Sequence, residues 1–167
     1  SNVLSFPPPR ATFTFTVTRD AEAGVWVAVC DDLCVATEAP TYEALLERVS
    51  AYFEAVTRAV NAEEGTIDKF IGDGVMAFWG APALLEDHAQ RSCFAALRIR
   101  EGMKELNAGW EATGAKPLKV RIGIHSDAVL VGNIGSKERM SYTVMGDGVN
   151  IAARLEGINK EYGTGIC

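Results

Sequence analysis

Two segments of this sequence constrain its fold more than any other part. The first is GTIDKFIGDG at residues 65–74, and the second is YTVMGDGVNIAARL at residues 142–155. Each predicts a strand that breaks at a Gly-Asp pair, and the second then continues into a helix. On that helix Asn150 and Arg154 are four residues apart, so they lie on one face. Lysine, aspartate, asparagine and arginine together favour a site for metal ions and phosphate groups.

Composition favours one compact globular domain. The chain has 167 residues, of which 48% are apolar and 23% charged, so it can bury a sizeable core. Its net charge of −6 disfavours a nucleic-acid surface, which needs clustered Lys and Arg. The sequence has neither a signal peptide nor an apolar run of the ~20 residues that span a bilayer, so we expect a cytoplasmic protein without a membrane partner. Residues 1–10 are expected to be a tag or a disordered tail.

Apolar periodicity predicts an α+β, ferredoxin-like fold with a mainly antiparallel sheet and helices on one face. A helix is expected to open at Thr41, and its apolar stripe continues from Leu45 to Val60 without a break. We therefore expect residues 11–167 to form a single domain. The other predicted elements are hairpins at 13–29 and 66–79, helices at 85–106 and 149–162, and strands at 118–125, 129–133 and 142–145.

Several motifs occur in the order that is typical of one enzyme family. From about residue 52 to 167 the chain resembles the class III adenylate/guanylate cyclase catalytic domain, through GTIDKFIGDGVMAFWGAP, VRIGIH, VGNIGS and YTVMGDGVNIAARLE. The resemblance implies conversion of ATP to cyclic AMP and pyrophosphate. It also implies a two-metal site that holds Mg²⁺ or Mn²⁺, and a homodimer whose two chains share the active site.

The same resemblance implies a role for each of five residues. Asp73 resembles the second metal-binding aspartate of the family. Lys69 resembles the lysine that selects the base, and Thr143 stands where a bacterial subgroup has threonine, so this pair favours adenine over guanine. Asn150 resembles the asparagine that orients the ribose. Arg154 resembles the arginine that stabilises the transition state.

Each of these roles has a structural alternative that the sequence leaves open. Asp73 lies between two glycines, as is typical of a tight hairpin turn. Arg154 on an exposed helix face is by default a solvated charge. Asn150 is equally suited to the cap or the first turn of the helix that follows Gly148.

The chain departs from the cyclase pattern at its front. Cyclase domains open with Phe-x-Asp-Ile-x-Gly-Phe-Thr, whose aspartate binds both metals, and this sequence lacks that motif. Residues 11–49 instead resemble a small HicB-like antitoxin domain, which suggests a spliced or engineered hybrid. Asp31 follows the strand-like VWVAV and is a candidate replacement ligand for the metal, with a plain strand-end aspartate as the alternative. At its other end the sequence stops before the last third of the cyclase pattern.

Three functions are compatible with these features. The first is a purine nucleotide cyclase whose activity is impaired because the first metal motif is missing. The second is a catalytically inactive hybrid fold. The third is a HicB-like module that binds another protein, and it is the weakest because only part of such a module is present.

Overall fold

The structure is a computed structural model that describes residues 16–20, 25–30, 35–39, 41–71 and 74–167. Within these ranges seven strands and three helices follow in the order β-β-β-α-β-β-α-β-β-α. The helices are α1 (Tyr42–Ala62), α2 (His88–Ala112) and α3 (Asp147–Tyr162). The strands are β1 (Thr16–Asp20), β2 (Val25–Cys30), β3 (Val35–Ala39), β4 (Thr66–Ile71), β5 (Gly74–Phe78), β6 (Leu130–Gly135) and β7 (Met140–Met145).

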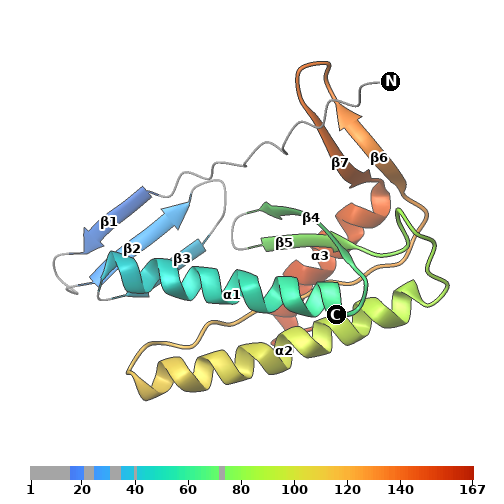
Figure 1. Cartoon of the computed structure of the whole chain (residues 1–167). Helices are drawn as coiled ribbons and strands as arrows, with labels where there is room; N and C mark the ends of the chain where they lie inside the picture. The colour runs from blue at the N-terminus through green and yellow to red at the C-terminus, as the bar shows by residue number, and fades with distance from the viewer. Residues whose placement is uncertain (1–15, 21–24, 31–34, 40, 72–73) are drawn as a thin grey trace.

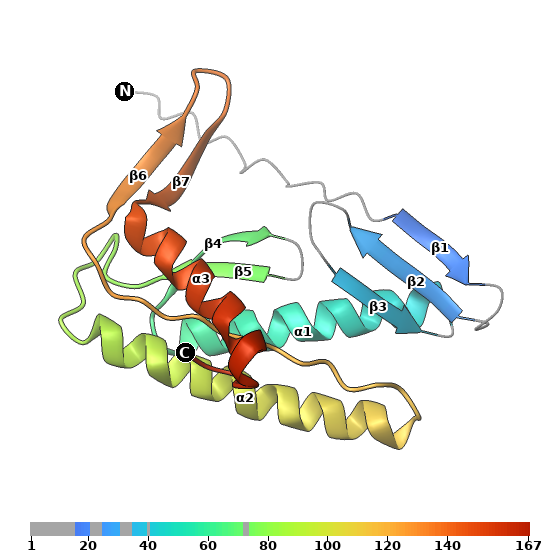
Figure 2. The same ribbon diagram turned by 180° about the vertical axis from the view of Figure 1, so that it is seen from behind.

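The described strands pair in three antiparallel sheets, β1-β2-β3, β4-β5 and β6-β7. The three-stranded sheet lies at the N-terminal end of α1, and the β6-β7 hairpin stands at the opposite end of the molecule (Figures 1 and 2). The predicted α+β class is confirmed. Strand β3 was not predicted from the sequence. No helix in the described ranges is both long and apolar enough to cross a lipid bilayer.

Helix α1 begins where the sequence predicted. Thr41 is its N-cap, and the Thr41 hydroxyl accepts a hydrogen bond of 3.1 Å from the amide of Ala44. The helix continues without interruption through residues 49–53. Leu45 in its first turns and Val60 in its last turn are both buried. The predicted apolar stripe is therefore one continuous packing face.

The core lies between α1 and α2, which run side by side (Figure 1). The β4-β5 hairpin covers this helix pair through partly buried side chains that include Ile67 and Trp79. The Trp79 indole also donates a hydrogen bond of 2.9 Å to the carbonyl of Glu63, just after α1. Each fully buried aliphatic side chain contributes about 1.5–3 kcal/mol to folding. The central buried residues are Val56, Ala59, Val60, Ile99 and Met103.

The strand predicted at residues 118–125 is not formed, because this stretch belongs to none of the sheets in the described part of the chain. Its one bridge pairs Ile122 in parallel with Ile166. The amide of Ile122 donates to the carbonyl of Gly165 at 2.9 Å, and the amide of Cys167 donates to the carbonyl of Ile122 at 3.0 Å. Its backbone therefore pairs with the last residues of the chain.

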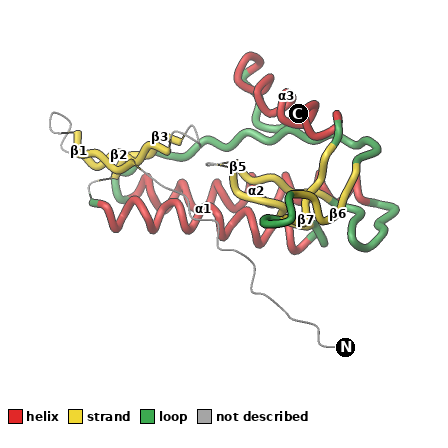
Figure 3. Tube along the Cα trace, turned by 90° about the horizontal axis from the view of Figure 1, so that it is seen from above, coloured by secondary structure: helices red, strands yellow, loops and turns green. Residues whose placement is uncertain are grey.

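Residue 123 lies in close contact with α3. A Cβ at Gly123 would clash with the carbonyl oxygen of Ala152 and the amide nitrogen of Glu156. Both are backbone atoms, so they could not move aside for a Cβ without displacing the helix. Figure 3 shows α3 on the far side of the long connection after α2, away from α1.

A buried asparagine connects α3 to residues 118–125 by hydrogen bonding. Asn159 is 1% exposed, and its side-chain amide donates to the carbonyls of Ile122 at 2.9 Å and Leu155 at 3.1 Å. Its side-chain oxygen accepts a hydrogen bond of 2.6 Å from the Thr164 hydroxyl. All the hydrogen bonds of the carboxamide therefore stay inside the fold, as buried polar groups require.

Candidate functional site

The structure brings together Lys69 and Thr143, the two residues predicted to read a base. Lys69 lies on β4 and Thr143 on β7, 74 residues later in the chain. The Lys69 ammonium donates a hydrogen bond of 2.8 Å to Thr143 Oγ1. The Lys69 side chain is 43% exposed whereas Thr143 is buried. The pair therefore forms a polar site that is open on the lysine side.

A third residue, which the sequence analysis missed, joins this pair. The Asp68 carboxylate accepts a hydrogen bond of 2.6 Å from the Thr143 hydroxyl and one of 3.2 Å from the Lys69 ammonium, both at Oδ2. The Val144 amide lies 3.4 Å from the same oxygen. Asp68 Oδ1 is 3.2 Å from the Lys69 ammonium but accepts no hydrogen bond, and the whole side chain is 1% exposed. Asp68 is thus the buried anchor of the cluster.

An irregularity in β4 places Asp68 in this position. Ile67 pairs with Ala77 and Lys69 with Met76, so Asp68 is an extra residue that faces no partner on β5. Such a bulge breaks the alternation of side chains along the strand. As a result Ile67 packs on the core while Lys69, two residues later, is exposed, and Asp68 turns toward β7. The sequence signal was a carboxylate beside the lysine in the middle of the strand TIDKFI.

Helix α3 presents the other two predicted site residues, Asn150 and Arg154. Both are exposed, and within the described residues neither makes a side-chain hydrogen bond or ion pair. The N-cap of α3 is Gly146, so Asn150 is the fourth helical residue and the capping alternative is excluded. Because α3 leaves directly from the end of β7, Asn150 follows Thr143 closely in the chain (Figure 2). No polar contact joins Arg154 to Lys69 in the described structure.

The candidate metal ligands cannot be placed. Asp31 and Asp73 lie outside the described residues. Within the described ranges, no group of three or more His, Cys, Asp or Glu side chains is arranged to hold a metal ion. The described residues therefore form no complete set of ligands for a metal ion.

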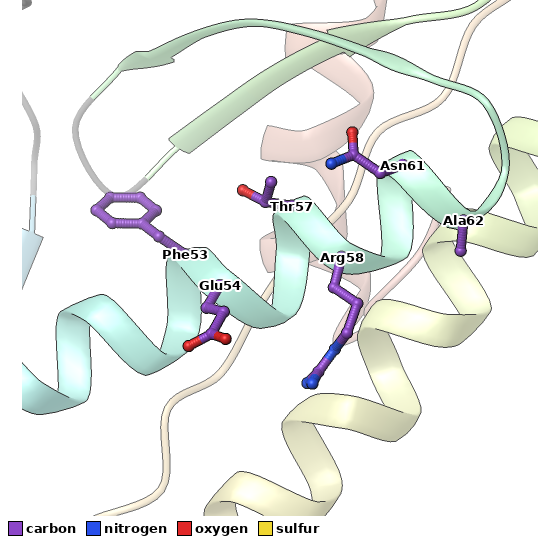
Figure 4. A pocket seen from close by; sticks show the side chains of 6 residues that line it. All are labelled: Phe53, Glu54, Thr57, Arg58, Asn61 and Ala62. Atoms are coloured by element: carbon purple, nitrogen blue, oxygen red, sulfur yellow. The ribbon is translucent and has the colours of Figure 1, made fainter.

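A hollow of about 610 Å³ lies along the exposed side of α1 (Figure 4). Among the described residues its walls come from α1, and they include neither Lys69 nor Thr143. We therefore place the candidate site at the Lys69 cluster. The hollow is lined by Phe53, Glu54, Thr57, Arg58, Asn61 and Ala62.

The fold and this cluster define an α+β domain with a polar Lys69–Thr143 pair between two hairpins. The model of the adenylate and guanylate cyclase catalytic domain matches residues 27–162, and the chain therefore belongs to that family. The match begins inside residues 11–49. The resemblance of those residues to HicB, and with it a hybrid origin, stays a prediction.

Two curated relatives are adenylate cyclases. Adenylate cyclase 1 of Rhizobium meliloti (strain 1021) is 41% identical over 135 residues, which are 81% of this chain and 20% of that protein. The adenylate cyclase of Anabaena cylindrica is 34% identical over 121 residues, 69% of this chain and 23% of that protein. The chain thus spans about a fifth of the length of these relatives.

Solved cyclase structures share the fold. The adenylyl cyclase CyaB from P. aeruginosa is 38% identical with a TM-score of 0.67, over 71% of this chain and 62% of that one. The guanylyl cyclase Cya2 is 34% identical with a TM-score of 0.65, over 71% of this chain and 60% of that one. The two neighbours differ in the base named for their activity, so the likeness in fold alone does not select adenine.

Proposed function

We propose that this chain is an adenylate cyclase catalytic domain that binds ATP at Lys69 and Thr143. The hydrogen bond between these two side chains carries the proposal, because it unites residues from two distant motifs at one open site. The family match and the adenylate cyclase relatives support it.

In the proposed reaction the ribose 3′-hydroxyl oxygen attacks the α-phosphorus of ATP. A bond forms between that oxygen and the α-phosphorus while the bond to the β-phosphate oxygen breaks, so pyrophosphate leaves and the hydroxyl proton is released. Asn150 would orient the ribose by hydrogen bonding. Arg154 would stabilise the negative charge that develops on the phosphoryl oxygens. The family generally uses divalent metals, and Asp73 and Asp31 are our candidates for holding Mg²⁺ or Mn²⁺.

We expect turnover to be low. The sequence lacks the family motif whose aspartate binds both metals and whose amides hold the triphosphate. Phosphoryl transfer depends on positioned charges, so losing these groups costs several orders of magnitude in rate. A catalytically inactive hybrid is the second candidate function, and the same missing motif favours it.

The arrangement of the exposed residues supports a homodimer. Asn150 and Arg154 are solvent-exposed and lack polar partners in the described part of the chain, while Lys69 lies on another element. A second copy would bring the α3 residues of one chain to the base site of the other. Sedimentation equilibrium at high micromolar concentration should show a dimer. A strictly monomeric species would contradict this part of the proposal.

Calorimetry with ATP and Mg²⁺ tests the proposed site directly. We expect saturable binding that Lys69→Ala weakens by about tenfold or more, because charge-assisted hydrogen bonds contribute ~1.5–3 kcal/mol. Lys104→Ala is the matched control, since Lys104 is an exposed lysine on α2. Cyclic AMP formation should stay near background. Absence of ATP binding, or equal affinity in Lys69→Ala, would show the proposal wrong.

A further inference from the structure

We infer that Asp68 is a positioning residue that fixes the hydrogen-bond direction of the Thr143 hydroxyl, so that Thr143 presents an acceptor to the base. The inference rests on the proposed function and deepens it, because it assigns the preference for adenine to a side chain outside the predicted pair. Three observations carry it: the burial of Asp68, its contact with Thr143, and the shared contact of both with Lys69.

The direction of the hydroxyl follows from the groups around it. A threonine hydroxyl has one hydrogen to donate and two lone pairs. A carboxylate can only accept, so the Thr143 hydrogen points at Asp68, and the distance of 2.6 Å is typical of a charge-assisted O–H···O⁻ bond. Lys69 can only donate, and it occupies one lone pair of the same oxygen. Thr143 therefore keeps one free lone pair and has no hydrogen left for a ligand.

The same count applies to Lys69. Its ammonium has three hydrogens, of which one goes to Thr143 and one to Asp68. One donor remains for a ligand. Together the pair offers one acceptor, at Thr143, and one donor, at Lys69.

This pattern matches the pairing edge of adenine. Adenine presents an exocyclic amine that donates and a neighbouring ring nitrogen that accepts, whereas guanine presents an acceptor and two donors. Adenine therefore satisfies both protein groups and keeps no unpaired group on that edge. Guanine would leave one donor without a protein partner, and unpaired polar groups lower affinity.

The surroundings of Asp68 indicate a role beyond stability. Its side chain is 1% exposed, yet Oδ1 accepts no hydrogen bond. A buried carboxylate that is not fully satisfied costs free energy, and an apolar side chain at such a position is often neutral or stabilising. The bulge at Asp68 also interrupts the pairing of β4 with β5. Bulges that re-aim a side chain occur often beside active sites.

Asp68→Asn tests the inference through base preference. The asparagine amide can donate to Thr143, which frees the Thr143 hydrogen to point at an acceptor such as the carbonyl of guanine. Calorimetry with ATP and with GTP should show a preference for ATP in the wild-type chain. We expect Asp68→Asn to reduce the ratio of ATP to GTP affinity by about tenfold. Glu105→Gln, which removes an exposed charge on α2, should leave the ratio unchanged.

A double-mutant cycle separates positioning from general damage. If Asp68 acts through Thr143, then Asp68→Asn in a Thr143→Val background should change the ratio by less than about twofold. Equal weakening of ATP and GTP by Asp68→Asn would overturn the inference, because it would indicate a structural role. The same change of ratio in both backgrounds would also overturn it.

A further measurement uses the wild-type chain alone, without a variant and without a nucleotide. The Thr143 hydroxyl proton should be protected from solvent exchange and visible by NMR at low temperature. Exchange as fast as in an exposed threonine would overturn the inference. If the proton is protected but neither nucleotide binds, the proposed function is wrong and the proposed base reading is wrong with it. If ATP is preferred and Asp68→Asn leaves the ratio unchanged, only the inference fails.

Discussion

At the scale of single residues, sequence and structure agree on Lys69 and Thr143 and differ on what connects them. Their contact is present in the structure, whereas their role in reading a base stays a prediction. Asp68 was not predicted because its position depends on a bulge, and the bulge is set by the pairing register of β4 with β5. Nothing in the local pattern of TIDKFI shows which residue is extra. The carboxylates Asp31 and Asp73 stay predictions, since both lie outside the described residues.

Asn159 provides a stability prediction at this scale. Replacing it with alanine removes the bonds to the carbonyls of Ile122 and Leu155 and leaves the Thr164 hydroxyl without its acceptor. We expect Asn159→Ala to lower the free energy of unfolding by about 1–3 kcal/mol. Urea denaturation followed by circular dichroism measures this.

Asn61→Ala serves as the control for that experiment, because Asn61 is an exposed asparagine on α1. Its effect should stay within about 0.5 kcal/mol, as is usual for surface positions. An equal effect of the two substitutions would show that the buried network at Asn159 contributes nothing specific.

At the scale of elements, apolar periodicity predicted helices better than sheet membership. The stripe of α1 is visible in sequence because a 3.6-residue period reports one buried face. Residues 118–122 do alternate in burial, and Leu118, Val120 and Ile122 pack against the core. The alternation of buried and exposed residues indicates which side chains face inward. Strand pairing instead depends on which backbone segment lies alongside. Here that partner is residues 165–167, far away in the chain.

The missed strand β3 illustrates a second limit. Val35–Ala39 is a short strand that pairs along its whole length with β2. Five residues contain too few periods to separate a strand from a loop. Thr41 was predicted as the start of α1, which the structure confirms, but no strand was predicted before it.

At the scale of the whole molecule, we predict that the chain folds without a boundary near residue 50. Helix α1 crosses that point, and both of its halves pack on α2. In the first half Arg48 is buried, and its guanidinium lies 4.7 Å from the centre of the Trp110 ring. A cut within α1 would expose this contact together with the apolar stripe.

Limited proteolysis with mass spectrometry checks this prediction. We expect no stable fragment that begins near Tyr52, and a single cooperative transition on thermal unfolding. A protected fragment of residues 52–167 would contradict it, and would favour two modules joined within one helix.

The contact at Gly123 has a consequence for how cyclase geometry could be tuned. Because the backbone of α3 contacts Gly123, the placement of that helix depends on the absence of a Cβ atom at residue 123. Adding one methyl group there would tilt or shift the helix while the proposed site residues Asn150 and Arg154 stayed chemically intact. The placement of these residues relative to Lys69 would thus change, in evolution or by design, through a substitution at residue 123.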